Sequence, residues 1–339
     1  MKKMGLIAAT AAMTVGLSVN ASAADTLASV KERGFVQCGV TTGVPGYSNP
    51  DDKGNWKGMD VDVCRGIAAA TLGDADKVKY IPLNAKERFT ALQSGEIDVL
   101  SRVTTWTLTR DSSLGLNFAG VTYYDGQGFL INKNLGVKSA LELDGASICI
   151  QSGTTTELNA ADYFRENKMQ FEPVVFDTAD QTVKGFEAGR CDVLTSDQSQ
   201  LYALRIKLSN PSSAMILPEI ISKEPLGPVV RQGDDAWFNV VKWSLFAMIN
   251  AEELGLTSKN IDGKKNSKNP NIARFVGSEG IKGTGLALSD NWAYNIVKQV
   301  GNYGEAFDRN LGMSSPLKIE RGLNALWNKG GLQYAPPIR

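Results

Sequence analysis

One stretch organises the rest of this sequence: Ile97-Asp98-Val99-Leu100-Ser101-Arg102-Val103-Thr104-Thr105-Trp106-Thr107-Leu108-Thr109-Arg110. It begins as a short apolar run after Gly95, which is typical of a buried strand, and then changes abruptly to hydroxyl residues and an arginine. In open α/β sheets, ligands bind in the crevice beyond the carboxyl ends of strands. The polar end of this strand is therefore a candidate binding site.

A second copy of the unit lies further along the chain. Residues 95–100, Gly-Glu-Ile-Asp-Val-Leu, are echoed by residues 189–194, Gly-Arg-Cys-Asp-Val-Leu, which run into Thr195-Ser196-Asp197. The first copy ends in hydroxyls plus Arg110, and the second ends in hydroxyls plus Asp197. Two such strand ends facing each other would offer a cation and an anion to one small zwitterion.

Each half of the sequence follows a strand, loop and helix order. In the first half, Asp60 is expected to cap a helix that ends near Gly73. In the second, Thr154 opens a helix with Glu157 at its third position. The free amides at such a helix start favour a carboxylate ligand, but an ordinary capping box explains the same spacing equally well.

The N-terminus has the features of a secretory signal peptide. Lys2 and Lys3 precede a short apolar segment, which ends in an Ala21-Ser22-Ala23 cleavage site. Removal of residues 1–23 leaves 316 residues with 34 basic and 36 acidic side chains, a net charge of about −2. A soluble periplasmic protein is expected, and its charge gives no reason to expect a nucleic acid partner.

The four cysteines and the absence of histidine limit the possible chemistry. In an exported protein an even cysteine count indicates two disulfides, with three possible pairings. We favour Cys38 with Cys64 and Cys149 with Cys191, because each bridge then joins neighbouring elements of one half. Without histidine, a Ser-His-Asp or Cys-His nucleophile is excluded and a zinc site has almost no ligands, so we expect no catalytic residues, no metal and no cofactor.

Several motifs resemble those of one protein family. Residues 103–110 resemble the Thr-x-Thr-x-x-Arg segment of periplasmic solute-binding proteins of polar amino-acid ABC transporters (bacterial extracellular solute-binding proteins, family 3), and Gly58-Met59-Asp60, Ser152-Gly153-Thr154 and Ser196-Asp197 are similar to further landmarks in order. The resemblance runs from about Leu27 to Leu254. The tail, with Asp290-Asn291-Trp292 and Gln299-Val300-Gly301-Asn302-Tyr303-Gly304, resembles the general L-amino-acid-binding branch.

The resemblance implies an α/β, two-lobed fold of the type II periplasmic-binding-protein kind, with a C-terminal helical extension. Residues 24–126 and 229–339 would form the first lobe and residues 127–228 the second, joined by two crossing strands. The expected partners are an L-amino acid and an inner-membrane ABC permease, and the expected state is a monomer.

The resemblance also assigns roles to individual residues. Arg110 would bind the α-carboxylate, helped by Thr105 and by the amide of Thr155 beside Thr154. Asp197 would bind the α-ammonium, helped by the carbonyl of Val103. Both pairings are chemically sound, because a guanidinium can meet a carboxylate through two bonds and a carboxylate accepts from an ammonium.

The sequence departs from narrower family members at the positions expected to contact the ligand side chain. Aromatic rings are absent at Gly43 and Ala85, and a lysine is absent near Gln151. These departures predict a roomy, partly water-filled pocket and broad specificity. Two alternatives share the fold: a dehydratase of cyclohexadienyl substrates, which needs a general acid that only Asp197 could supply, and a sensor that docks on a chemoreceptor.

Overall fold

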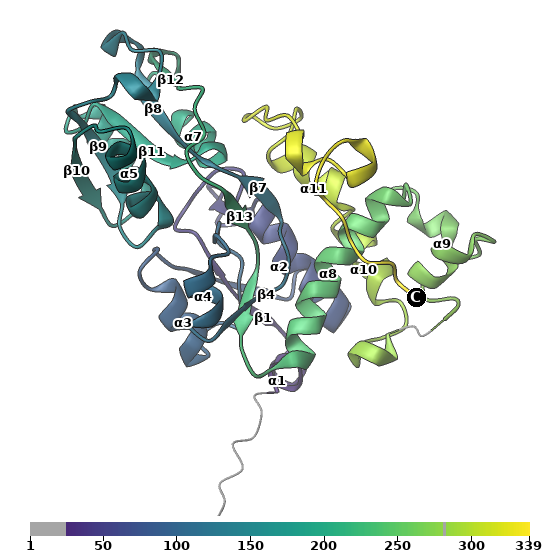
Figure 1. The fold of residues 1–339 in the computed structure, drawn as a ribbon. Helices are drawn as coiled ribbons and strands as arrows, with labels where there is room; N and C mark the ends of the chain where they lie inside the picture. Colours follow the sequence, from purple (N-terminus) through teal and green to yellow (C-terminus); the bar gives the residue numbers. More distant parts are fainter. Residues whose placement is uncertain (1–24, 281–282) are drawn as a thin grey trace, which may run out of the picture.

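The chain folds into two α/β lobes and a helical extension (Figure 1). The structure, a computed structural model, describes residues 25–280 and 283–339, so the signal peptide expected at residues 1–23 lies outside the described residues. One lobe is built on a five-stranded sheet in the order β4-β1-β5-β14-β6, and the other on a sheet in the order β10-β9-β11-β8-β12. The expected two-lobed α/β fold is confirmed.

The strands and helices have the following bounds. The first sheet contains β1 (Val36–Val40), β4 (Val78–Pro82), β5 (Val99–Leu100), β6 (Leu116–Phe118) and β14 (Val229–Arg231). The second contains β8 (Gln127–Asn132), β9 (Ala146–Gln151), β10 (Phe171–Phe176), β11 (Val193–Asp197) and β12 (Ala214–Ile216). The helices are α1 (Thr26–Arg33), α2 (Met59–Leu72), α3 (Arg88–Ser94), α4 (Leu108–Ser112), α5 (Thr155–Glu166), α6 (Ala179–Glu187), α7 (Gln198–Arg205), α8 (Asp235–Glu253), α9 (Pro270–Phe275), α10 (Trp292–Gln299) and α11 (Tyr303–Asn310).

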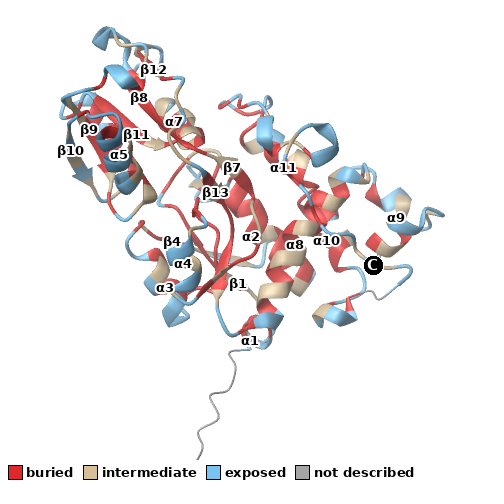
Figure 2. Cartoon of the chain, in the orientation of Figure 1, coloured by how far each residue is buried: buried red, intermediate tan, exposed pale blue. Residues whose placement is uncertain are grey.

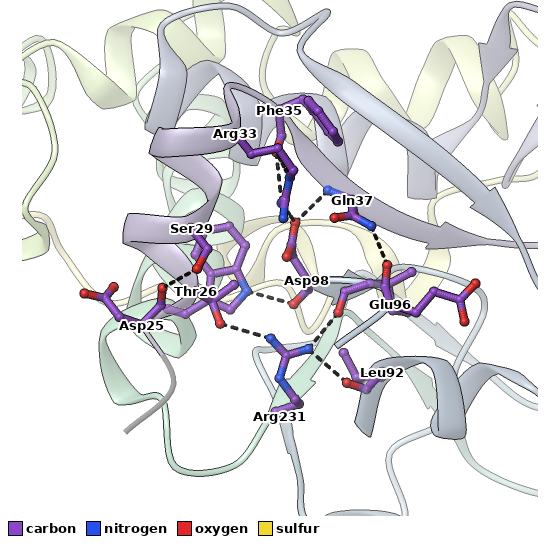
Figure 3. Close-up of polar contacts among 12 residues, drawn as sticks. Asp25, Thr26, Ser29, Arg33, Phe35, Gln37, Leu92, Glu96, Asp98 and Arg231 are labelled. Atoms are coloured by element: carbon purple, nitrogen blue, oxygen red, sulfur yellow. Dashed lines mark hydrogen bonds and ion pairs between the residues drawn. The ribbon is translucent and has the colours of Figure 1, made fainter. Parts of the chain in front are cut away.

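The strand that delivers the predicted site, β5, is short but firmly held. Its preceding residue, Asp98, accepts hydrogen bonds on its carboxylate from the amide of Gln37 and from the guanidinium of Arg33 (Figure 3). The carbonyl of Asp98 accepts from Nε1 of Trp237 at 2.8 Å, and Arg231 donates to the carbonyl of Ile97 at 2.7 Å. These contacts fix the position at which the chain leaves the sheet.

Asp60 has a different role from the one expected. Helix α2 begins at Met59 with Gly58 as its N-cap, and no side chain caps it. The Asp60 carboxylate instead accepts from Oγ of Ser101 and from the amide of Val103, both at 3.0 Å, and burial raises the pKa of Asp60 to about 7. Asp60 therefore holds the turn after β5, where Val103 adopts an unusual φ of 43°.

Two antiparallel strands connect the lobes, as predicted. Strand β7 (Tyr123–Asp125) pairs with β13 (Glu224–Leu226). The C-terminal extension supports the first of them, because the side chain of Asn324 bonds to both the amide and the carbonyl of Tyr124, at 2.7 and 3.2 Å. The hydroxyl of Tyr303 donates to the carbonyl of Thr122 at 2.7 Å.

The extension shares a hydrophobic core with the first lobe. Helix α10 packs against α2 and α8, and buried residues run along the first sheet and along the facing sides of these helices (Figure 2). Trp237 is among the largest fully buried side chains. Within the described residues, none of the helices has the length and apolar character needed to span a bilayer.

Both expected disulfides are confirmed. Cys38 in β1 is bonded to Cys64 in α2 with a Cα–Cα distance of 6.3 Å, and Cys149 in β9 is bonded to Cys191, just before β11, at 5.6 Å. Neither bridge links the two sheets, so the bridges do not restrict movement of one lobe relative to the other.

Removing the second bridge should destabilise its lobe without affecting closure. The double variant Cys149→Ser/Cys191→Ser removes a bridge between two residues that are 42 positions apart. The loop-entropy model gives about 3–4 kcal/mol of lost stability for a loop of this length. Chemical denaturation followed by circular dichroism should show an earlier unfolding transition. An unchanged transition would mean that packing alone holds β9 and β11 together.

Candidate ligand-binding cleft

The structure brings all the predicted binding residues to one cavity between the lobes. The first lobe contributes Val103, Thr105 and Arg110, and the second contributes Thr154, Thr155 and Asp197. The sequence analysis did not assign binding roles to the other lining residues, which are Arg88, Arg102, Gln151, Thr156, Ser196 and Gln200. The space that a water molecule could occupy is about 20 Å³, enough for roughly one water.

Arg110 lies in α4, where the hydroxyl of Thr107 caps the helix and accepts from the Arg110 amide. Its Nη1 donates to the carbonyl of Thr105 at 2.9 Å, and this is its one side-chain hydrogen bond among the described residues. Burial lowers the pKa of Arg110, but a guanidinium remains charged in proteins. Most of its five N–H donors are therefore left for a ligand or water.

The start of α5 is not closed by a capping box. Thr154 occupies the N-cap position without a side-chain cap bond, because its hydroxyl donates instead to the carbonyl of Gln151 at 2.7 Å. Of the two interpretations of the Thr154 and Glu157 spacing, the capping box is therefore absent. Among the described residues no side chain caps this first turn, and Thr155 lines the cavity. Uncapped amides at a helix start suit an anion.

Asp197, the last residue of β11, provides the negative end of the cavity. It is 4% exposed and accepts from the side-chain amide of Gln200. Burial raises the pKa of Asp197 well above its usual range, and the nearby charges of Asp125 and Glu224 raise it further. A ligand ammonium beside Asp197 would offset this repulsion and favour the ionised carboxylate.

The two crossing strands supply the other carboxylates. Glu224 in β13 accepts from the hydroxyl of Thr155 at 2.9 Å and from the side-chain amide of Asn159 at 2.6 Å. Asp125 in β7 accepts from the hydroxyl of Ser199, and burial raises the pKa of Asp125 to about 7. Two of the carboxylates near Asp197 therefore lie on the strands about which the lobes would move.

The carbonyl of Val103 already has a cation near it. Nη1 of Arg88 lies 3.5 Å from this carbonyl oxygen, while the amide of Val103 is bound by Asp60. A ligand ammonium could use the Val103 carbonyl only beside, or in place of, this guanidinium.

The lobes touch each other around the cavity. Nζ of Lys86 lies 2.8 Å from a carboxylate oxygen of Asp177, and Nζ of Lys207 donates to the carbonyl of Gly43 at 3.1 Å. The hydroxyls of Tyr47 and Ser199 form a further hydrogen bond between the lobes. The structure therefore shows a closed arrangement, and a molecule of amino-acid size can enter only after the lobes separate.

The expected roomy pocket is wrong for this conformation. The cavity holds only about 20 Å³, and neither Gly43 nor Ala85 lines it. Within the described part of the chain, no group of three or more histidine, cysteine, aspartate or glutamate side chains is placed to hold a metal ion.

Two lobes that close on a small polar cavity, with a cation from one lobe and an anion from the other, define a binding protein. The chain belongs to the bacterial extracellular solute-binding proteins, family 3, whose family model matches residues 36–260.

Similar proteins include full-length relatives. The general L-amino acid-binding periplasmic protein AapJ of Rhizobium johnstonii is 62% identical over 341 residues, covering 100% of both chains. The glutamate/glutamine/aspartate/asparagine-binding protein BztA of Rhodobacter capsulatus is 51% identical over 95% of this chain and 96% of its own. A solved periplasmic binding protein from Brucella ovis with glutathione bound is 60% identical and has a TM-score of 0.92, covering 93% of this chain and 100% of its own.

Proposed function

We propose that this protein captures L-amino acids between its two lobes in the periplasm and delivers them, as a monomer, to an ABC permease in the inner membrane. The observation that carries the proposal is the placement of Arg110 and Asp197 on opposite lobes at one cavity. The ligands named for the AapJ and BztA relatives support it. Glutathione, bound in the Brucella ovis relative, also has an α-amino acid end.

In this proposal each group of the ligand has a defined partner. Arg110, Thr105 and the amide of Thr155 at the start of α5 bind the α-carboxylate, and Asp197 binds the α-ammonium. The moving units are residues 24–126 with 229–339 and residues 127–228, and the signal peptide is removed after Ala23. Closure is favoured because the ligand bridges groups that belong to different lobes.

The same site predicts comparable affinities for several amino acids. The proposed clamp binds only groups that every L-amino acid has. Dissociation constants for glutamate, glutamine, leucine and histidine should fall within about two decades. This range corresponds to a difference in binding free energy on the order of 3 kcal/mol. Calorimetric titration of the purified protein with all twenty amino acids tests this. One strong binder among twenty would contradict it.

Binding without catalysis is the second part of the proposal. The enzyme alternative would need Asp197 as a general acid, and its raised pKa is the feature that suits that role. Prephenate and arogenate, incubated with the protein and followed by chromatography, should remain unchanged. If the wild-type protein dehydrated either compound faster than the Asp197→Asn variant, the protein would be an enzyme and the transport proposal would be contradicted.

A further inference from the structure

Tyr47 links the two lobes at a point outside the ligand cavity. It lies in the loop between β1 and α2 of the first lobe, and its hydroxyl is hydrogen-bonded to the hydroxyl of Ser199, near the start of α7 in the second lobe. The two residues are 2% and 1% exposed, and neither lines the cavity that holds Arg110 and Asp197. The Tyr47 hydroxyl has no other hydrogen-bond partner among the described residues. Separation of the lobes would therefore break this bond.

Ser199 is held against the crossing strand β7. Its amide, at 3.3 Å, and its hydroxyl both donate to the carboxylate of Asp125, the last residue of that strand. The amide of the preceding residue, Gln198, donates to the carbonyl of Gly126 at 2.7 Å. An ionised carboxylate can only accept hydrogen bonds, so Ser199 donates to Asp125 and Tyr47 donates to Ser199. Burial raises the pKa of the Tyr47 hydroxyl well above its usual range, which keeps it protonated and able to donate.

The first lobe holds Tyr47 in place independently of the second. The carbonyl of Tyr47 accepts from the amide of Asp60 at 3.0 Å, and the carbonyl of Gly46 accepts from the amide of Met59 at 2.9 Å. The ring of Tyr47 meets the ring of Tyr123 edge to face, with centroids 6.1 Å apart. Replacing Tyr47 with phenylalanine would keep these contacts and remove only the bond between the lobes.

We propose that the hydrogen bond between Tyr47 and Ser199 is a closure latch, which stabilises the closed form equally for every ligand and slows ligand release. The proposal rests on the capture function proposed above and adds to it two positioning residues that do not touch the ligand. A contact that exists only in the closed form shifts the equilibrium toward closure. Because the latch does not contact the ligand, it cannot distinguish one amino acid from another, in contrast to side chains that line the cavity.

Calorimetry with Tyr47→Phe tests the latch. Affinities for the amino acids that the wild type binds, such as glutamate and glutamine, should each fall about threefold to tenfold, as expected for one neutral hydrogen bond. The factor should be the same for each ligand. Stopped-flow fluorescence should show ligand release that is faster by this factor and an unchanged association rate.

Tyr80→Phe is the matched control, because it removes the same group from a tyrosine elsewhere in the first lobe. Tyr80 lies in β4, packs against Trp56 and does not line the cavity. This variant should bind and release each amino acid as the wild type does.

A double-variant cycle assigns the effect to the bond itself. Ser199→Ala also removes the latch, so adding Tyr47→Phe to it should weaken binding no further, because the Tyr47 hydroxyl has already lost its partner. If Tyr47→Phe caused its full loss of affinity in the Ser199→Ala background as well, the hydroxyl would act elsewhere and the proposal would be overturned.

Three other outcomes would overturn the latch and leave the capture function intact. They are a normal affinity in Tyr47→Phe, a loss confined to the association rate, and a loss that differs severalfold between ligands. The last of these would mean that Tyr47 contacts the ligand. If the wild type binds none of the twenty amino acids, the latch and the proposed function both fail.

Discussion

Replacing Arg110 with alanine should weaken amino-acid binding by about 2–5 kcal/mol, because the ligand carboxylate would then be poorly paired in a largely dry cleft. The loss should appear as impaired initial capture, since Arg110 belongs to the lobe that we expect to bind the ligand first. Calorimetric titration with glutamine, whose side chain carries no carboxylate, measures the change in affinity.

Two comparisons make this prediction specific. Arg110→Lys keeps the charge but loses the paired donors, so it should recover only part of the affinity. Arg65→Ala removes the same charge from an ion pair outside the cavity and should bind normally. Normal binding by Arg110→Ala would place the carboxylate elsewhere, with Arg88 or Arg102 as the remaining cations that line the cavity.

Truncating Asp197 should produce a loss of similar size, again about 2–5 kcal/mol, but of a different kind. Asp197→Ala removes the partner of the ammonium from the second lobe, so weak binding to the open form should remain while closure is prevented. Calorimetry with glutamate and with glutarate, which lacks the ammonium group, separates the two effects. The wild type should strongly prefer glutamate, and the variant should not.

Asp162→Asn is the matched control for this variant. Asp162 lies on α5 of the same lobe and pairs with Arg165 at the surface. Its loss should leave the preference for glutamate unchanged. A preference retained in Asp197→Ala would show that Asp197 is a structural residue at the end of β11 and that the ammonium binds elsewhere.

The repeated strand ends made the centre of the site predictable from sequence. Both copies place polar residues directly after a buried strand, β5 in the first sheet and β11 in the second, and ligands bind beyond such carboxyl ends. That reasoning located Arg110 and Asp197 at a common cavity. The disulfide pairing was predictable for a similar reason, because each pair joins neighbouring elements of one half.

Arg88 could not be assigned from its own sequence context. It follows Asn84 and Glu87 at the start of an ordinary-looking helix, where an arginine is usually exposed to solvent. It becomes a site residue only because the second lobe closes against this helix start and the carbonyl of Gly153 comes within 3.4 Å of Nη2. Contacts between distant halves of a chain leave no local pattern.

The cap at Thr154 shows a second limit of local patterns. A threonine followed three residues later by a glutamate is typical of a capping box. In this chain the hydroxyl of Thr154 instead donates to the carbonyl of Gln151. The spacing of Thr154 and Glu157 cannot distinguish this arrangement from a capping box.

Small-angle X-ray scattering with and without saturating glutamine tests the central claim most directly, namely that Arg110 and Asp197 close the two lobes on one amino acid. The wild type should become more compact when ligand is added, and Asp197→Ala should show little change at a ligand concentration that saturates its weaker site. Equal compaction of the two proteins would contradict the claim, because closure would then not depend on the contact between the ligand ammonium and the second lobe.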